Sequence, residues 1–204
     1  MIRKVLLVVC ILGATLMATE EPKYKVVEKI GRIEIREYEP YLVAQTKVNG
    51  SFDQAGNQAF RILFQYISGA NKTQASIAMT APVAQTKNSG TSIAMTAPVA
   101  QTKESDGTWN VSFMVPSTFT EETVPQPTDP RVNIVAIPRS LVAAINTSGF
   151  WSESKVKEAE IELERFLQTS TYLRQGPYTY GRYNAPFVPF FMRRNELMCT
   201  VVKK

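Results

Sequence analysis

The side chains that could do chemistry in this 204-residue chain are large, flat or polarisable, and they are accompanied by arginines. The sequence contains no histidine, so it excludes acid–base catalysis by imidazole, histidine-activated nucleophiles and histidine metal ligands. Phenylalanine and methionine side chains line apolar pockets for flat ligands, and arginine binds carboxylates at a ligand's edge through paired hydrogen bonds. The residues that we identify as candidate ligand contacts are Phe60, Arg61, Phe64, Met79, Met95, Phe187 and Arg193.

No combination of residues predicts a catalytic site. The chain lacks a glycine-rich phosphate loop and a G-x-S-x-G turn. Glu158, Glu160, Glu162 and Glu164 fall on a predicted helix, where such acidic runs usually form a solvated face. We therefore expect a binding protein and not an enzyme, and the sequence leaves the presence of a metal ligand open.

The first 18 residues are typical of a secretory signal peptide. Arg3 and Lys4 precede an uncharged run over residues 5–19, with small residues around Ala18 for cleavage. The run is shorter than the roughly 20 apolar residues that span a bilayer, so we expect no stable membrane insertion after cleavage; an uncleaved anchor is the alternative. The mature protein would be one secreted or periplasmic domain over residues 22–204, without an intrachain disulfide.

The first half of the mature chain has the pattern of strands followed by a helix. Residues 24–48 show a period of two, interrupted by turn residues, which predicts three strands. Apolar residues at helical spacing then predict a helix over residues 52–68, with Ser51 and Gln54 as a capping box. Residues 109–115 alternate again and predict another strand.

The second half repeats this order after a proline-rich, extended connection. Strands are predicted over residues 132–137 and 141–147, a helix follows Gly149, and strands over residues 178–183 and 196–202 close the chain. Strands, helix and strands in two similar halves predict an α+β domain with mainly antiparallel pairing. Two helices would cover one face of a curved sheet or open barrel.

One segment, SIAMTAPVAQTK, occurs at residues 76–87 and again at residues 92–103. Its large side chains lie two or four residues apart, which predicts a strand in each copy, and its proline favours a sheet edge or a bulge. The turn signal Asn88-Ser89-Gly90 between the copies predicts an antiparallel hairpin. If both apolar sets are buried, paired residue numbers must have an even sum, which places Met79 and Met95 on the same face.

Several motifs, in order, resemble the SOUL haem-binding protein family. They are IAMTAPV after a helix that ends in YISGAN, then WNVSFMVPS, TVPQPTDP and YNAPFVPFFMRRNE, and the match runs from Tyr24 to Val202. The resemblance implies two βαββ-like halves that form a distorted antiparallel β-barrel flanked by two helices. It also implies non-covalent binding of haem or a related tetrapyrrole and no established catalytic mechanism. The duplicated motif resembles a form found in bacterial members, which suits a signal peptide.

The absence of histidine restricts how a haem could be held. Its binding would rest on burial of the flat ring, on arginine or lysine contacts to the two propionates, and at most on a Met, Tyr or Cys199 axial ligand. We expect the ring beside the first helix, against Phe60 and Phe64, with Arg61 or Arg193 near the propionates. For Arg193 and the adjacent arginine, a structural ion pair with a carboxylate is the alternative.

Two other functions stay open at this point. One is a binding module for another apolar ligand or a protein partner, and the other is a tetrapyrrole-modifying enzyme that removes iron. After signal removal, 21 basic residues face 18 acidic ones, a balance too mild to suggest a nucleic-acid partner. The sequence does not predict the oligomeric state.

Overall fold

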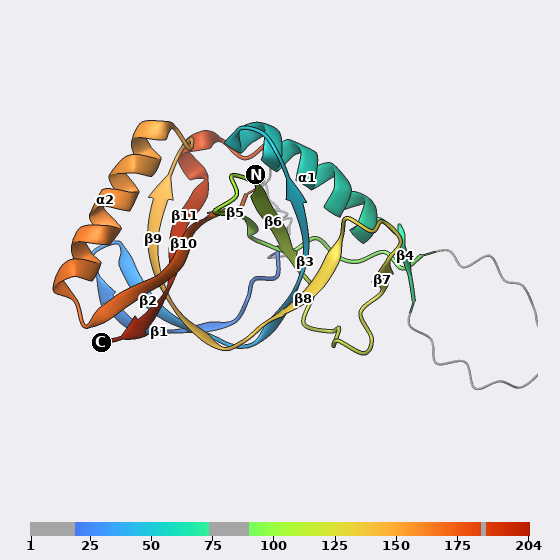
Figure 1. The fold of residues 1–204 in the computed structure, drawn as a ribbon, viewed down its shortest axis with the longest axis horizontal. Coiled ribbons are helices and arrows are strands. Elements are labelled where there is room, and N and C mark those ends of the chain that lie inside the picture. The colour runs from blue at the N-terminus through green and yellow to red at the C-terminus, as the bar shows by residue number, and fades with distance from the viewer. Residues whose placement is uncertain (1–18, 74–89, 185–186) are drawn as a thin grey trace, which may run out of the picture.

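The described part of the chain forms one curved antiparallel sheet with two helices packed on it, which confirms the predicted α+β class (Figure 1). The computed structural model describes residues 19–73, 90–184 and 187–204. Within these ranges, no helix combines the length and apolar composition needed to cross a bilayer. The elements are β1 (Tyr24–Ile30), β2 (Ile33–Tyr38), β3 (Tyr41–Val48), α1 (Phe52–Ile67), β4 (Asn71–Lys72), β5 (Val99–Lys103), β6 (Trp109–Met114), β7 (Gln126–Pro127), β8 (Asn133–Ile137), β9 (Ser140–Ser148), α2 (Glu153–Thr169), β10 (Tyr172–Arg182), the 3-10 turn η1 (Phe190–Met192) and β11 (Arg194–Lys203).

Most elements lie where the periodicity of the sequence predicts them. α1 begins after the predicted capping box, in which the Ser51 side chain accepts a hydrogen bond from the Gln54 backbone and the Gln54 side chain accepts one in return. β10 begins at Tyr172, earlier than predicted. The strand pairs with β11 both before and after a bulge, which lies between Gln175 and Thr179.

The sheet is curved but open. Its strand order is β1-β2-β9-β11-β10-β5-β6-β3-β8, so β1 and β8 form its two edges, and β4 pairs with β7 in a separate ribbon. β2 pairs with β9, whereas β3 pairs with β6 and β8, so the turns β2–β3 and β8–β9 both cross between the two halves. The barrel implied by the family resemblance is thus present as a curved sheet with two edges.

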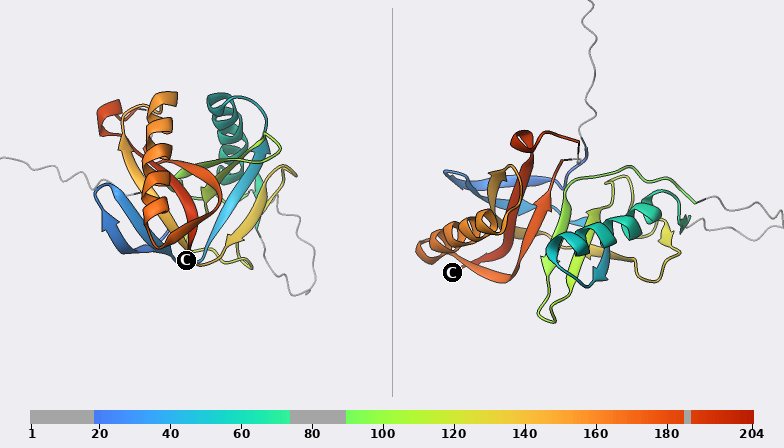
Figure 2. Two further views of the ribbon diagram at one scale, coloured as in Figure 1. Left: turned by 60° about the vertical axis from the view of Figure 1, so that its left-hand side comes forward. Right: turned by 90° about the horizontal axis from the view of Figure 1, so that it is seen from above.

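Each half of the sheet turns one face toward a helix. Alternation directs Ala44 of β3 and Phe113 of β6 into a core with Leu63 of α1. In the other half, Ile35 and Leu197 pack in a core with residues of α2. Figure 2 shows the two helices side by side, one over each half of the sheet. Burial of each large side chain contributes about 1.5–3 kcal/mol, so these two cores hold the helices in place.

The second copy of the duplicated segment ends in a strand, β5, which covers Val99–Lys103 and follows Pro98. β10 pairs with one edge of β5 and β6 with the other. The first copy, Met79, the predicted hairpin and its register lie outside the described residues.

The sequence pattern predicted that the glutamates of α2 form a solvated face, but three of them, Glu160, Glu162 and Glu164, contact other parts of the chain. Glu162 forms an ion pair with Arg32, which precedes β2. The hydroxyl groups of Tyr178 and Tyr180 on β10 donate to Glu164 and Glu160, each at 3.0 Å. The first contact comes from a part of the chain distant in sequence and the other two from the strand that follows α2, and together they attach α2 to the sheet.

A buried ion pair connects β2 to β11 across β9. Arg36 is 3% exposed and Glu196 has no exposed surface, and two hydrogen bonds of 2.7 and 2.9 Å join guanidinium and carboxylate. Glu196 also accepts hydrogen bonds from Tyr183 at 2.6 Å and from Arg194 at 3.0 Å. Burial opposes ionisation of Glu196, but its hydrogen bonds and the charge of Arg36 outweigh burial, so its pKa lies below the ordinary value.

We expect Glu196→Gln to lower the free energy of unfolding by about 3–5 kcal/mol, because it removes the buried counterion of Arg36 and leaves only the partly exposed Glu34 as its ion-pair partner. The folded state lowers the pKa of Glu196, so its contribution is present above the ordinary glutamate pKa and is lost as the pH falls through the lowered value. Urea unfolding at pH 7 and at acidic pH measures both effects.

The matched control is Glu162→Gln, at the partly exposed pair with Arg32, which should cost less than about 1 kcal/mol. Equal losses in the two variants would contradict a special role for Glu196. So would an acid-dependent loss of stability that is as large in Glu196→Gln as in the unmodified protein.

Candidate functional site

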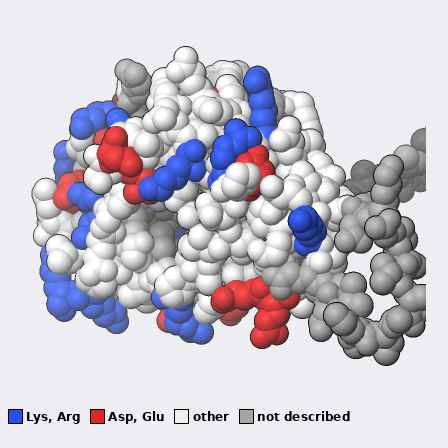
Figure 3. All heavy atoms as spheres, turned by 45° about the vertical axis from the view of Figure 1, so that its right-hand side comes forward, with Lys and Arg blue, Asp and Glu red and all other residues white. Residues whose placement is uncertain are grey.

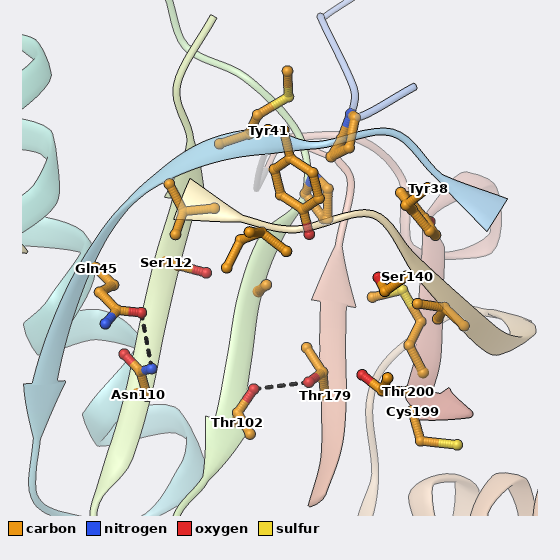
Figure 4. Close-up of a pocket in the computed structure, with 18 of the residues that line it drawn as sticks. Tyr38, Tyr41, Gln45, Thr102, Asn110, Ser112, Ser140, Thr179, Cys199 and Thr200 are labelled. Carbon is orange, nitrogen blue, oxygen red and sulfur yellow. Dashed lines mark hydrogen bonds between the residues drawn. The ribbon is translucent and has the colours of Figure 1, made fainter. Parts of the chain in front are cut away.

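The face of the sheet opposite the helices surrounds a cavity of about 240 Å³ (Figure 4). Strand alternation explains its position: Tyr41, Val43 and Gln45 of β3 line it, while Ala44 and Val48 of the same strand face α1. The other lining residues come from β2, β5, β6, β8, β9, β10 and β11 and from neighbouring turns. The cavity therefore spans both halves of the sheet.

Neutral hydrogen-bonding groups ring this cavity. The hydroxyl groups of Thr102 and Thr179 lie 2.8 Å apart across β5 and β10. On the next strand, β6, the Asn110 amide donates to Gln45 Oε1 at 3.0 Å, and Asn110 is the register partner of Thr102. Figure 4 shows the phenol of Tyr41 pointing into the cavity that these pairs line. The cavity thus combines an apolar wall with hydroxyl and amide groups from several strands.

The described side chains that line the cavity carry no formal charge at neutral pH. Burial raises the pKa of Tyr38 to about 12, so its phenol stays protonated. Tyr183 donates to Glu196, and burial raises the pKa of this phenol as well. Tyr38, which accepts from Arg36 at 3.3 Å, and Tyr183 mark the end of the cavity nearest the buried ion pair. The charges of that pair compensate each other outside the lining.

Three of the predicted ligand contacts form one surface, which we call the α1 platform: Phe60, Arg61 and Phe64. The rings of Phe60 and Phe64 are nearly parallel, with centroids 5.7 Å apart and an interplanar angle of 12°, and Phe64 is 49% exposed. Phe113 of β6 holds Phe60 edge-on at 5.5 Å. Arg61 is exposed and lies three residues before Phe64, so both share the same helix surface.

Two other predicted contacts, Phe187 and Arg193, lie between β10 and β11. Arg193 shares a surface with Phe150 and Phe190, which we call the loop platform. Phe187 is 87% exposed, and Phe190 stacks on Phe150 with centroids 5.1 Å apart and an angle of 10°. The Arg193 guanidinium lies 5.3 Å from the centre of the Phe150 ring, and its Nε donates to the Val188 carbonyl at 2.8 Å.

The two platforms lie at separate places on the molecule. Arg182, where β10 ends and the loop begins, pairs with Asp53 in the first turn of α1 at 2.9 Å. Phe64 lies eleven residues further along α1, about 16 Å away at the rise of an α-helix. The described ring contacts of Phe60 and Phe64 are with each other and with Phe113, whereas Arg193 contacts Phe150 and Val188.

The remaining predicted contacts are less informative. Met95 is 40% exposed and lies before β5, and Met79 lies outside the described residues. The adjacent Arg194 forms the structural ion pair with Glu196 that was the alternative to a ligand contact. The sequence patterns did not lead us to predict Phe150 or the inner cavity.

A pattern that could have indicated the cavity is the run of polar residues that alternates with apolar ones on β3 and β6.

No metal centre is evident among the described residues, which contain no group of three or more Cys, Asp or Glu that could hold an ion. Burial raises the pKa of Cys199 to about 12, and its side chain packs in the core under α2. On the face that Figure 3 shows, several lysine and arginine side chains lie directly beside acidic ones, with uncharged surface around them.

The match to a known family covers most of the chain. The family model described as SOUL heme-binding protein matches residues 19–200. This chain belongs to the SOUL heme-binding protein family. The resemblance carried by the sequence motifs is thereby confirmed. Among SOUL relatives, Heme-binding protein 2 of Homo sapiens is 29% identical over 191 residues, which cover 90% of this chain and 87% of the relative. Heme-binding protein 2 of Mus musculus is 29% identical over 192 residues, which cover 91% and 87%.

Solved structures share the fold at much lower identity. The C-terminal domain of EcmrR aligns with a TM-score of 0.61 and 12% identity over 89% of this chain and 99% of that domain. A hydrolase from Listeria innocua aligns with a TM-score of 0.51 and 12% identity over 86% and 94%. At such identities the likeness concerns the fold alone, and the function of this SOUL protein must be argued from its own residues.

Cys199 is predicted to be inert in the folded protein. In a Cys10→Ser chain it is the only thiol, and we expect a disulfide reagent such as DTNB to modify it at least about 100-fold more slowly before unfolding in urea than after. Burial explains this, because it limits access and raises the pKa of the thiol to about 12. Rapid, complete modification of the native protein would show that the thiol is accessible as a ligand.

Proposed function

We propose that this SOUL-family protein binds haem or a related tetrapyrrole non-covalently, with the ring against the α1 platform. Membership of the family supports the class of ligand. The observation that supports the place is the pair of parallel rings, Phe60 and Phe64, with the exposed Arg61 beside them. Parallel aromatic rings offer a flat apolar contact to a macrocycle, and a guanidinium binds a propionate through two hydrogen bonds.

The polar edge of the ligand would meet the outer side of α1. Asn57 is exposed one turn before Arg61, so its amide can donate to the second propionate. Phe60, Phe64 and Asn57 have no ionisable side chain, so they supply no acid or base for chemistry on the ring. This favours a binding protein over an enzyme that removes iron.

The inner cavity is a poor place for a haem. Its volume of about 240 Å³ is below the roughly 300–1,000 Å³ of pockets that enclose drug-sized ligands. Its described lining also carries no charge to balance two propionates. An ionised group without a partner would lose hydration there at a high cost in free energy.

Few side chains of this protein could serve as axial ligands to the iron of a bound haem. The sequence has no histidine, and the Cys199 thiol is buried with a raised pKa. Binding would then rest mainly on ring stacking and on the propionate contacts, with a methionine such as Met95 or a tyrosine as the remaining axial candidates. Haem supplies its iron chemistry when bound, and the protein's part is to hold the ring.

The proposed site of action lies outside the cytoplasm. The basic start, the short apolar run and the small residues near Ala18 support a secretory signal over residues 1–18. A secreted or periplasmic protein would meet haem outside the cell membrane. N-terminal sequencing of the protein recovered from the periplasm or medium would show whether the chain begins after the signal.

A haemin titration tests the proposal. We expect a saturable Soret shift near one equivalent and at least about ten-fold weaker binding in Phe64→Ser, because burial of a phenylalanine is worth about 1.5–3 kcal/mol. Arg61→Glu should weaken haemin binding and have less effect on a porphyrin whose propionates are esterified. The control is Phe190→Ser on the loop platform, which should leave the affinity unchanged.

Each other outcome has a clear meaning. The absence of a saturable Soret shift would defeat haem binding by this protein. Weaker binding in Phe190→Ser together with normal binding in Phe64→Ser would move the haem to the loop platform, where Arg193 lies over Phe150.

A further inference from the structure

We infer that the inner cavity is a second binding site, which takes a small, neutral, aromatic molecule with one or two hydrogen-bonding groups. The inference starts from the cavity itself, which lies on the face of the sheet opposite both helices. It does not depend on the proposed haem site, because Phe60 and Phe64 project from α1 on the other side of the sheet.

The volume of the cavity indicates the size of its ligand. An apolar cavity of about 150 Å³ holds one benzene molecule. The volume here, about 240 Å³, therefore suits a molecule of one to two fused rings and is too small for a porphyrin. The cavity is partly enclosed by three tyrosines, Tyr38, Tyr41 and Tyr183, whose rings can pack against a flat ligand.

The lining indicates an amphipathic ligand. Val43, Val142 and Met114 provide apolar contacts on β3, β9 and β6. Between them, the paired hydroxyls of Thr102 and Thr179 can each turn toward a ligand, since a hydroxyl donates one hydrogen bond and accepts two. A ligand with an apolar ring and a hydroxyl or indole N–H would use both kinds of contact.

The absence of charge among the described lining residues indicates that the ligand is neutral. The nearest buried charges, Arg36 and Glu196, are joined by two hydrogen bonds, and Glu196 also accepts from Tyr183 and Arg194. This carboxylate is therefore already satisfied and cannot serve as the counterion of a cationic ligand. An anion or a cation in the cavity would lose hydration without gaining a partner.

Titration of the full chain with 2-naphthol, followed by calorimetry or by naphthol fluorescence, tests this inference. We expect saturable binding at one site, and binding of the 2-naphthoate anion that is at least about ten-fold weaker because its charge finds no counterion. Ser112→Phe fills the cavity from β6 and should abolish measurable naphthol binding. The matched control, Ser154→Phe at an exposed position of α2, should bind naphthol normally.

Two further variants keep the test decisive. If Ser112→Phe fails to fold, Thr179→Val preserves the side-chain size, removes one hydroxyl of the Thr102 pair, and should weaken naphthol binding by about three- to ten-fold. Phe64→Ser should leave naphthol binding intact while it weakens haemin binding, so the two sites fail separately. No saturable naphthol binding, equal affinity for naphthoate, or unchanged binding in both cavity variants would overturn the inference.

Discussion

The buried carboxylate of Glu196 imposes the constraint on which much of the structure depends. A charge with no exposed surface needs ion-pair and hydrogen-bond partners in direct contact, because leaving it unpaired would lower the free energy of unfolding by several kcal/mol. Its partners come from distant parts of the chain: Arg36 from β2, Tyr183 after β10, and Arg194 at the start of β11. Arg194 also binds Glu21, at the start of the described domain. The first strands and the last strand must therefore assemble together before the carboxylate is satisfied.

This compensation also decides the character of the sheet's inner face. The two helices cover the opposite face, where alternate residues of the central strands build the two cores. Other residues of these strands line the inner cavity, and the buried ions beside it, Arg36 and Glu196, neutralise each other. One face of the sheet is consequently structural, and the other is uncharged, partly polar and hollow. The outer surface of α1 carries a separate apolar platform, Phe60 and Phe64, with the cation Arg61 beside it.

Features that depend on neighbours in sequence could be predicted, and features that depend on distant contacts could not. Period-two and helical patterns act within a few residues, which is why the first three strands and α1 with its Ser51 cap lie where expected. The pairing of β5 was not predicted in the same way, because its neighbours are β6 and β10. A turn sequence close to β5 carries no information about a strand that lies about 75 residues later in the chain. The site shows the same division. Phe60, Arg61 and Phe64 share one turn of a helix, whereas Phe187 and Arg193 were grouped with them by residue type alone.

The chain contains no histidine, and this limits how this member of the haem-binding family could hold a haem. Without an imidazole, iron coordination contributes little, so affinity has to come from contact with the ring and from its propionates. In the proposed haem site, the exposed rings of Phe60 and Phe64 would cover one face of a macrocycle and select it by flatness and negative charge. The proposed site in the inner cavity would instead surround its ligand, limit its size and penalise any charge. The two proposed sites would thereby discriminate between ligands by different physical interactions, and neither would need the other in order to bind.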